Sequence, residues 1–432
     1  MQTNINFLIL LLLPHITNKY RIHYQLLMFT LSKKLFMAAG LAVCCAGANA
    51  GNLQRDTALA PVETQKPNTN YKPAFRGQTR IGGVKTKTPY AATVINNELK
   101  NPWGIHVLPD GRFLITEKAG SMRILKANGA FDKQITGFPP VLFKAQGGLL
   151  DVTIDPAFAT NRMVYWGYAE EAPGGSLLAI AKGKLSADET KLENVQVIYR
   201  AEPAYKGTLQ YGCRIVFDKN GNLFVSTGER SGADIRMKAQ DLGAGIGKII
   251  HITRAGKAVP GGPFGGKAGA LPEIYAYGLR NPDGLAWNPV TGDLWEAEFG
   301  PRGGDEINII KPGNNYGWPV ITYGIEYSGE KVGDGIQQKE GMTQPIYYWD
   351  PTISPGGITF YTGNIAEWKS NLFVGGLSGS HIARLVIRNN KVVGEERLLR
   401  DKNERWRALV TGKDGALYGL TDSGKFYRIA KK

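Results

Sequence analysis

Residues 283–300, DGLAWNPVTGDLWEAEFG, contain the pattern that decides the fold. Two short runs alternate apolar and polar residues and flank a turn rich in Asn, Pro, Gly and Asp, which is typical of a β-hairpin. The same unit occurs six times in chain order. The other five copies are WGIHVLPDGRFLITE from Trp103, GGLLDVTIDPAFATNRMVYWGY from Gly147, GCRIVFDKNGNLFVSTGE from Gly212, GGITFYTGNIAEWKSNLFVGGL from Gly356 and RALVTGKDGALYGLTD from Arg407.

A third strand follows several of these hairpins, at 122–127, 248–253 and 425–430. Repeated antiparallel units with variable insertions are typical of propeller blades. We therefore predict an all-β fold, a six-bladed β-propeller over residues 89–432, in which the segment 88–95 pairs with the last blade and closes the ring. A two-sheet sandwich is the alternative, but it does not require six copies of one unit. The longest intervals, near 161–212, 229–284 and 300–357, would supply the loops of a functional face.

The first fifty residues differ in composition from the rest of the chain. Two lysines precede a short apolar run that ends in Ala-Asn-Ala at Ala50, which predicts a secretory signal peptide, cleavage after Ala50 and a periplasmic protein. A membrane anchor is the alternative, but this apolar run is too short to span a bilayer. Residues 1–27 could be an upstream mis-start, and the polar segment 51–88 reads as a flexible lead-in.

The chain of 432 residues carries a net charge of +15. Residues 1–50 hold four basic residues and no acidic ones, so their removal lowers the charge to +11. This charge is scattered, and export argues against a nucleic-acid partner; a solvated surface with some affinity for anionic envelope polymers is the simpler interpretation. Only Cys213 remains after cleavage, which excludes an internal disulfide and suggests a buried apolar residue.

Two turns in the Gly-rich stretch 277–318 combine groups suited to a hard cation and an anionic ligand. Arg280 and Asn281 lie at the first turn and Gly300 to Glu306 at the second. A solvated acidic turn fits this spacing equally well. Arg405 and Arg407 flank Trp406, so as strand residues they point to the same side and suit a di- or tricarboxylate, although exposed surface arginines are as common.

Several motifs occur together in one order: AQGGLLDVTIDPAFATN, GLRNPDGLAWNP, EFGPRGGDEINII, NNYGWP, YYWDPTISPGGITFY and RWRALVTGKDGALYGLTD. This set resembles the soluble PQQ-dependent sugar dehydrogenases, in particular the aldose sugar dehydrogenase branch, over Thr93 to Lys432. The resemblance implies a periplasmic six-bladed propeller. It also implies pyrroloquinoline quinone (PQQ) and Ca²⁺ over the central channel, and oxidation of aldoses at the anomeric carbon to lactones.

The resemblance also implies roles for individual residues. The cofactor would contact Gln146, Arg280, Asn281, Ser378, Arg405 and Arg407. Gln146 and Trp349 would lie at the sugar, with Trp349 as a wall of its site. The carbonyls of Gly300 and Pro301 would face the cofactor-bound Ca²⁺, and Glu306 and the Tyr316 carbonyl would hold a second, structural Ca²⁺.

Two positions depart from the family pattern. Gln210 occupies the position of the histidine base, and an amide cannot accept a proton at neutral pH. The loop Leu377–Ser380 carries Ser378 where a cofactor-contacting lysine is expected. One hypothesis is that His381, beside this loop, replaces a lost group; a structural histidine is the alternative.

The leading prediction is a PQQ- and Ca²⁺-dependent aldose dehydrogenase in which Gln210 and Arg280 occupy the catalytic positions. Its partners would be an aldose and an electron acceptor, with no stable membrane insertion after cleavage, as a monomer or homodimer. A non-catalytic propeller that binds a carbohydrate, a quinone or a protein is the first alternative. A Ca²⁺-dependent lactonase-type hydrolase is the second.

Overall fold

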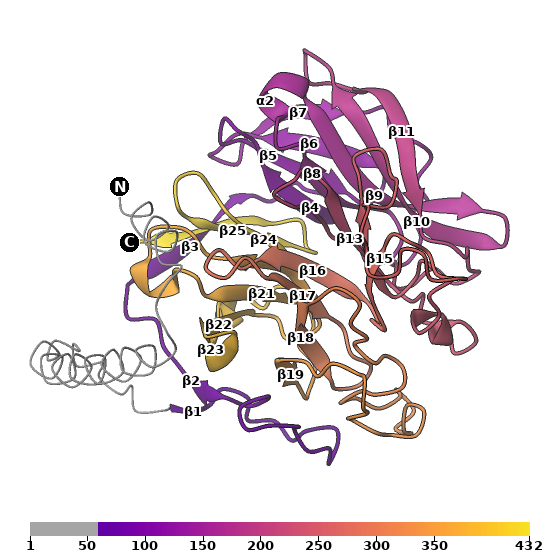
Figure 1. Ribbon diagram of the computed structural model, residues 1–432. Coiled ribbons are helices and arrows are strands. Elements are labelled where there is room, and N and C mark those ends of the chain that lie inside the picture. The colour runs from indigo at the N-terminus through magenta and orange to yellow at the C-terminus, as the bar shows by residue number, and fades with distance from the viewer. Residues whose placement is uncertain (1–58) are drawn as a thin grey trace, which may run out of the picture. The chain divides into compact units, whose positions relative to one another are not determined.

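Six sheets, one for each hairpin repeat, make up the part of the chain that the computed structural model describes, residues 59–432, and the four strands of each blade pair antiparallel (Figure 1). They are arranged as a six-bladed β-propeller, as predicted. The first three blades consist of β4 (Pro102–Val107), β5 (Phe113–Glu117), β6 (Ser121–Leu125) and β7 (Phe131–Ile135); β8 (Leu149–Ile154), β9 (Met163–Ala172), β10 (Gly175–Leu185) and β11 (Leu192–Arg200); and β12 (Ile215–Phe217), β13 (Leu223–Thr227), β14 (Lys248–Ile252) and β15 (Ile274–Tyr277).

The other three blades follow the same order from inner to outer strand. They consist of β16 (Pro282–Trp287), β17 (Leu294–Glu298), β18 (Asp305–Ile310) and β19 (Tyr347–Trp349); β20 (Pro355–Phe360), β21 (Leu372–Gly376), β22 (Ile382–Arg388) and β23 (Lys391–Leu398); and β24 (Trp406–Thr411), β25 (Leu417–Thr421), β26 (Phe426–Lys431) and β3 (Tyr90–Asn96).

Within residues 59–432, helical structure is confined to single turns: α2 (Phe158–Asn161), η1 (Arg236–Ala239), η2 (Ala366–Trp368) and η3 (Arg400–Lys402). Over residues 59–432, none of these is long and apolar enough to cross a membrane. The predicted signal peptide and its cleavage position lie outside the described residues.

The ring closes between the two ends of the propeller. Strand β3, near the start of the described chain, pairs antiparallel with β26, with Thr93 opposite Arg428 and Tyr90 opposite Lys431. The last blade is therefore built from three C-terminal strands and one N-terminal strand, which confirms the predicted role of segment 88–95. Pairing the two chain ends in one sheet links the start of the propeller to its end and so holds the ring closed.

The inner strands β4, β8, β12, β16, β20 and β24 contact one another in sequence around the channel. Their close approach requires glycine at particular points. A Cβ atom on Gly104 of β4 would lie 2.9 Å from the backbone of Leu150 and Asp151, and one on Gly357 of β20 would lie 3.0 Å from Ala408 Cα. Cys213 is fully buried beside this ring, as predicted for a small apolar side chain.

The N-terminal segment 59–88 lies against the fifth blade. Strand β2 (Gly82–Gly83) pairs parallel with β23, and β1 (Leu59–Pro61) pairs with β2. The backbone of Asn68 donates to Asp350 Oδ1 at 2.9 Å, and Arg80 Nη2 donates to the Asp350 carbonyl at 2.6 Å. We predicted a flexible lead-in over 51–88. Its described part instead belongs to the fold, because distant hydrogen bonds hold it, and a boundary at residue 88 does not separate it from the propeller.

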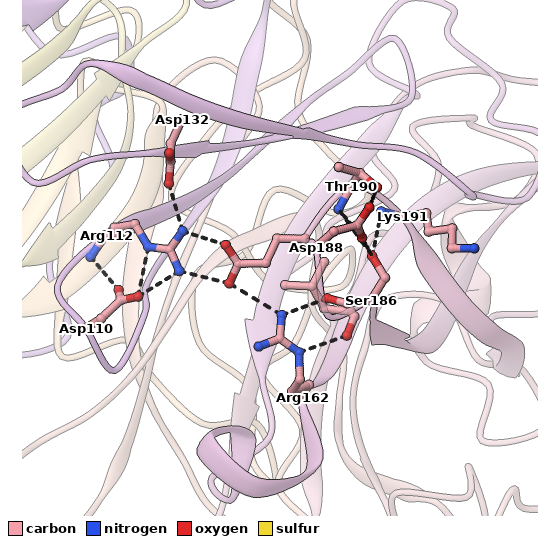
Figure 2. A network of polar contacts seen from close by, with 10 residues as sticks. Asp110, Arg112, Asp132, Arg162, Ser186, Asp188, Thr190 and Lys191 are labelled. Atoms are coloured by element: carbon pink, nitrogen blue, oxygen red, sulfur yellow. Dashed lines mark hydrogen bonds and ion pairs between the residues drawn. The ribbon is translucent and has the colours of Figure 1, made fainter.

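An ionic network joins the first two blades (Figure 2). Arg112, in the β4–β5 turn, pairs with Asp132 at 2.7 Å and with Glu189 in the β10–β11 turn at 2.6 Å. Asp110 lies 2.7 Å from the same guanidinium, and Arg162 reaches Glu189 at 3.4 Å. The three carboxylates hold the pKa of Arg112 well above its usual value, so its guanidinium remains charged.

Candidate active site

A cavity of about 500 Å³ opens at one end of the channel and draws its walls from all six blades and their loops. Nine of the predicted site residues line it: Gln146, Gln210, Arg280, Asn281, Gly300, Pro301, Ser378, Arg405 and Arg407. Five of the nine lie within the long intervals 161–212, 229–284 and 300–357: Gln210, Arg280, Asn281, Gly300 and Pro301. The structure therefore brings together most of the site that the motifs indicate.

Gln210 lies in a tightly fixed turn at the entrance to the third blade. Its backbone N–H donates to Gln146 Oε1 at 2.7 Å, and its carbonyl accepts from the backbone N–H of Arg230 at 3.2 Å. Its φ is 49°, in the left-handed region. A Cβ atom on the facing Gly228 would lie only 2.2 Å from the Gln210 carbonyl oxygen, so this turn requires glycine opposite it.

The side chain of Gln210 is buried with an unsatisfied acceptor. Its residue is 7% exposed, and Oε1 has no hydrogen-bond partner. A buried amide oxygen left without a donor costs about 1–3 kcal/mol, so a donor from a ligand or a water would stabilise it. Gln210 cannot itself take a proton.

Asn281 joins the third and fourth blades at the floor of the cavity. Its Oδ1 accepts from the backbone N–H of Gly212 at 3.0 Å, and its Nδ2 donates to Asp283 Oδ1 at 3.1 Å. Arg280 donates through Nη1 to the Gly300 carbonyl at 2.8 Å, while its buried Nε has no partner. Protein contacts therefore fix the Asn281 amide and one arm of the Arg280 guanidinium, whereas Arg280 Nε has no hydrogen-bond partner.

Two arginines from the sixth blade share one carboxylate. Arg405 Nε donates to Asp422 Oδ2 at 2.9 Å, and Arg407 donates to both Asp422 oxygens at 2.9 and 3.1 Å. Arg407 Nη1 also lies 3.5 Å from Asp283 Oδ2. Both side chains therefore point the same way, as predicted from their spacing around Trp406. With Arg280 they concentrate positive charge in the cavity.

The turn at Gly300 is held by a buried carboxylate. Asp305 accepts from the backbone N–H of Gly300 at 2.8 Å and from those of Ile353 and Ser354 at 2.7 Å each. A Cβ atom on Gly300 would lie 2.3 Å from the Gly303 carbonyl oxygen. The sequence GPRGGDE therefore specifies this turn sterically, and it places the Gly300 and Pro301 backbone at the cavity.

Three predicted residues do not lie at this cavity. Glu306, on the third strand of its blade, is buried beside Asn308, whose Nδ2 donates to it at 3.4 Å. The hydroxyl of buried Tyr316 donates to the Ile309 carbonyl at 2.6 Å. Trp349 is buried in the core on the outer strand β19, and its indole donates to Glu395 at 3.2 Å, which corrects its predicted place as a wall of the sugar site.

The hypothesis that His381 replaces a lost group is also wrong. Its Nδ1 donates to the Gly379 carbonyl at 2.6 Å, the residue is 1% exposed, and it does not line the cavity. Burial lowers the pKa of His381 to about 3, so the ring remains neutral. Ser378 does line the cavity, where its hydroxyl lies 2.8 Å from that of Ser354.

Sequence reasoning missed eleven residues of the lining, among them Asp283, Lys118 and Tyr327. Lys118 donates to the Ala145 carbonyl at 2.7 Å, and burial together with Arg407 lowers its pKa. A signal for Asp283 was available, since it follows Asn281 by two residues in an extended segment and so points to the same side. Lys118 and Tyr327 follow no such pattern.

A larger cavity of about 700 Å³ lies at the opposite end of the same inner strands. On β4, Trp103 lines the smaller cavity and Ile105 to Val107 line the larger one. On β24, Arg407 lines the smaller cavity and Ala408 to Val410 line the larger one. Its walls are mainly apolar strand residues. The smaller cavity holds the cluster of guanidinium and amide groups, so we take it as the candidate active site.

Comparison with known proteins identifies relatives of this chain. The chain is 37% identical over 345 residues to aldose sugar dehydrogenase YliI of Escherichia coli (strain K12), which covers 78% of this chain and 92% of that protein. Two solved structures share the fold. One is the apo-form of the soluble aldose sugar dehydrogenase from Escherichia coli, with a TM-score of 0.76, 37% identity and coverage of 80% of this chain and 100% of that one. The other is the PQQ-bound form of aldose sugar dehydrogenase from Streptomyces coelicolor, with a TM-score of 0.63, 25% identity and coverage of 79% and 98%.

The family model described as glucose / sorbosone dehydrogenase matches residues 99–428, which include five complete blades and most of the sixth. Every residue that lines the candidate active site lies within these bounds. On this match and on the relatives above, the chain belongs to the glucose / sorbosone dehydrogenase family.

Proposed function

We propose that this protein oxidises aldose sugars at the anomeric carbon to lactones, using PQQ and Ca²⁺. The observation that carries the proposal is the cavity itself, in which Arg280, Arg405 and Arg407 converge with the amides of Gln146 and Asn281. Arginine forks suit carboxylates because their paired N–H groups match both oxygens. A flat tricarboxylate such as PQQ fits this donor set.

The unsatisfied groups support the fit to a bound cofactor. Arg280 Nε and Gln210 Oε1 are buried without partners, so a ligand with both acceptors and donors would satisfy them. Arg405 and Arg407 would bind carboxylates, with Arg280, Asn281 and Ser378 as further contacts. Bound PQQ supplies a two-electron acceptor for the C–H bond that is broken.

Calcium is proposed at two places. The Gly300 and Pro301 carbonyls are the oxygens suited to the first ion, next to the cofactor. The Gly300 carbonyl already accepts from Arg280 at 2.8 Å, and its second lone pair remains available. Glu306 and the Tyr316 carbonyl, away from the cavity, would hold the second, structural ion.

A non-catalytic propeller is the second candidate, favoured by one observation: Gln210 stands where a base is expected. It would bind the cofactor, a carbohydrate or a protein without turnover. The lactonase-type alternative requires several carboxylate or Asn ligands around an axial ion. Within residues 59–432, Asp283 is the one carboxylate among the cavity-lining residues, which does not favour a hydrolase of that kind.

Reconstitution separates these candidates. Purified protein is titrated with PQQ in 1 mM CaCl₂, and the cofactor spectrum is recorded before and after addition of aldoses. Reduction of the bound cofactor by a sugar supports the dehydrogenase. Binding without reduction supports the non-catalytic propeller, and the lack of binding refutes both. Analysis of the product as lactone tests the position of oxidation.

We propose further that the protein is exported to the periplasm and passes its electrons to an external acceptor. The proposal rests on the basic and apolar sequence pattern that ends at Ala50. N-terminal sequencing of protein from the periplasmic fraction should give Gly51 as the first residue. Its recovery in the cytoplasm with residues 37–50 intact would contradict export.

A further inference from the structure

Asp283 is a buried carboxylate that lines the same cavity as Gln210. The residue is 4% exposed, and its side chain comes from the start of β16. Oδ1 accepts from Asn281 Nδ2 at 3.1 Å, and Oδ2 lies 3.5 Å from Arg407. Asn281 in turn holds the backbone of Gly212, two residues after Gln210, at 3.0 Å. One amide therefore couples this carboxylate to the turn where the base is missing.

The charged groups around Asp283 come from four other elements. Arg407 belongs to β24, and Arg214, just before β12, donates through Nε to the Asp283 carbonyl at 2.9 Å. Asp151 of β8 pairs with Arg214 at 2.7 Å, and Lys118 follows β5. Burial raises the pKa of Asp283 to about 7, assisted by Asp151 and opposed by Arg407, Arg214 and the Asn281 hydrogen bond. A carboxylate that titrates near neutral pH is suited to proton transfer.

The other groups that line the cavity cannot take this role. Arginine is not deprotonated in proteins, amides accept no proton, and Lys118 uses its Nζ as a donor to the Ala145 carbonyl at 2.7 Å. Among the lining residues of the described chain, only Asp283 combines a basic oxygen with burial. This inference rests on the proposed function, because it concerns the proton of the same sugar.

We propose that the carboxylate of Asp283 is the proton acceptor for the anomeric hydroxyl of the sugar, in place of the missing base at Gln210. The O–H bond breaks and its proton moves to an Asp283 oxygen. The C1–H electron pair leaves as hydride to oxidised PQQ, and the C1–O bond becomes the lactone carbonyl. The unsatisfied Gln210 Oε1 accepts a hydrogen bond from a second sugar hydroxyl and so orients the ring.

The first test measures Asp283 in the protein without cofactor. Burial also raises the pKa of Glu229 and Asp305 to about 7 and that of Glu298 to about 8. Infrared difference spectra between pH 5 and pH 9 should therefore contain several protonated carboxyl bands with midpoints near neutral pH, and Asp283→Asn should lose one of them. If Asp283→Asn retains every band of the parent protein, the inference is overturned, whatever the enzymatic activity.

The second test uses Asp283→Asn loaded with PQQ and Ca²⁺. We expect cofactor affinity within a few-fold of the parent, and single-turnover reduction by sugar slower by about 10²–10⁴-fold. The parent rate should rise with pH through about 7, and this rise should vanish in the variant. An Asp283 that only positioned Arg407 would instead weaken cofactor binding and leave the pH dependence intact, which would refute the proposal.

A matched control and a rescue sharpen the result. Asp422→Asn removes the other carboxylate paired with Arg407; at saturating PQQ it should keep the pH dependence. Adding Gln210→His to Asp283→Asn should restore turnover, with a pH dependence set by the imidazole. Parent protein that binds PQQ but is reduced by no aldose refutes the proposed function as a whole. Parent that is reduced, with Asp283→Asn equally fast, refutes the Asp283 step alone.

Discussion

Arg405 and Arg407 should contribute very unequally to cofactor binding, although both pair with Asp422. The side chain of Arg407 is 15% exposed, whereas that of Arg405 is 52% exposed. A charge-assisted hydrogen bond away from water contributes about 1.5–3 kcal/mol. At about 1.4 kcal/mol per factor of ten, Arg407→Met should raise the Kd for PQQ by about 10- to 140-fold.

Arg405 makes its contact in solvent, where ion pairs contribute only about 0.2–1 kcal/mol. Arg405→Met should therefore raise the Kd by about 1.5- to 5-fold. Methionine preserves much of the side-chain length and packing, so the comparison isolates the charge. Raising the salt concentration should reduce the effect of Arg405 more than that of Arg407, because exposed charges are screened more strongly.

Equilibrium titration of each variant with PQQ, followed by absorbance at two salt concentrations, measures both effects. Urea unfolding of the apo-proteins checks that the variants remain folded. Equal losses for the two variants, or a larger loss for Arg405→Met, would refute the argument from burial.

Arg407 also affects the pH dependence, with a definite sign. Its guanidinium lowers the pKa of Asp283, so its removal should raise that pKa further above 7. If Asp283 accepts the proton in its charged form, the rise in rate of Arg407→Met at saturating PQQ should move to higher pH. A shift to lower pH would contradict either the assignment of Asp283 or the sign of its coupling to Arg407.

Three other predictions concern the surroundings of the site. Lys118→Met should raise the Kd for PQQ by about 2- to 5-fold, as expected for a partly exposed cation, measured by the same titration. Arg230→Met should destabilise the protein in urea unfolding by about 1–3 kcal/mol for each buried carbonyl that loses its donor, because the guanidinium donates to the carbonyls of Ser176, Gly207 and Leu209. Chelation of Ca²⁺ should lower the melting temperature, since an ion at 100 times its Kd stabilises the folded state by about 2.7 kcal/mol; an unchanged melting temperature would contradict both proposed calcium sites.

The fold was predictable because its information is local. In each hairpin the strand residues alternate between apolar and polar, and the turn has a typical sequence. Both features can be recognised in a single sequence without knowing which segments pack together. The six hairpins and the closing strand β3 all lie where these patterns place them. The segment 59–88 was not predictable in this way. Its polar composition is that of a linker, and its contacts are to Asp350 and Glu395, about three hundred residues away.

The site was predictable only in part, for a geometrical reason. Motifs locate the turns at one end of the inner strands, so Arg280, Gly300 and Arg407 meet as expected. They do not show in which layer of a blade a residue lies. Trp349 belongs to the fourth strand of its blade, so it does not line the cavity at the channel. Lys118 reaches it from the end of β5 without any motif.

Burial and the surrounding arginines must act together for Asp283 to work as proposed. Without burial, the two guanidinia would hold the carboxylate charged far below neutral pH, where it would be too weak a base. Without Arg407 and Arg214, burial alone would keep it protonated and unable to accept a proton. Arg407 therefore has two roles, since the positive charge that suits a cofactor carboxylate also lowers the pKa of Asp283. Loss of the base at Gln210 is compatible with turnover only while this balance holds.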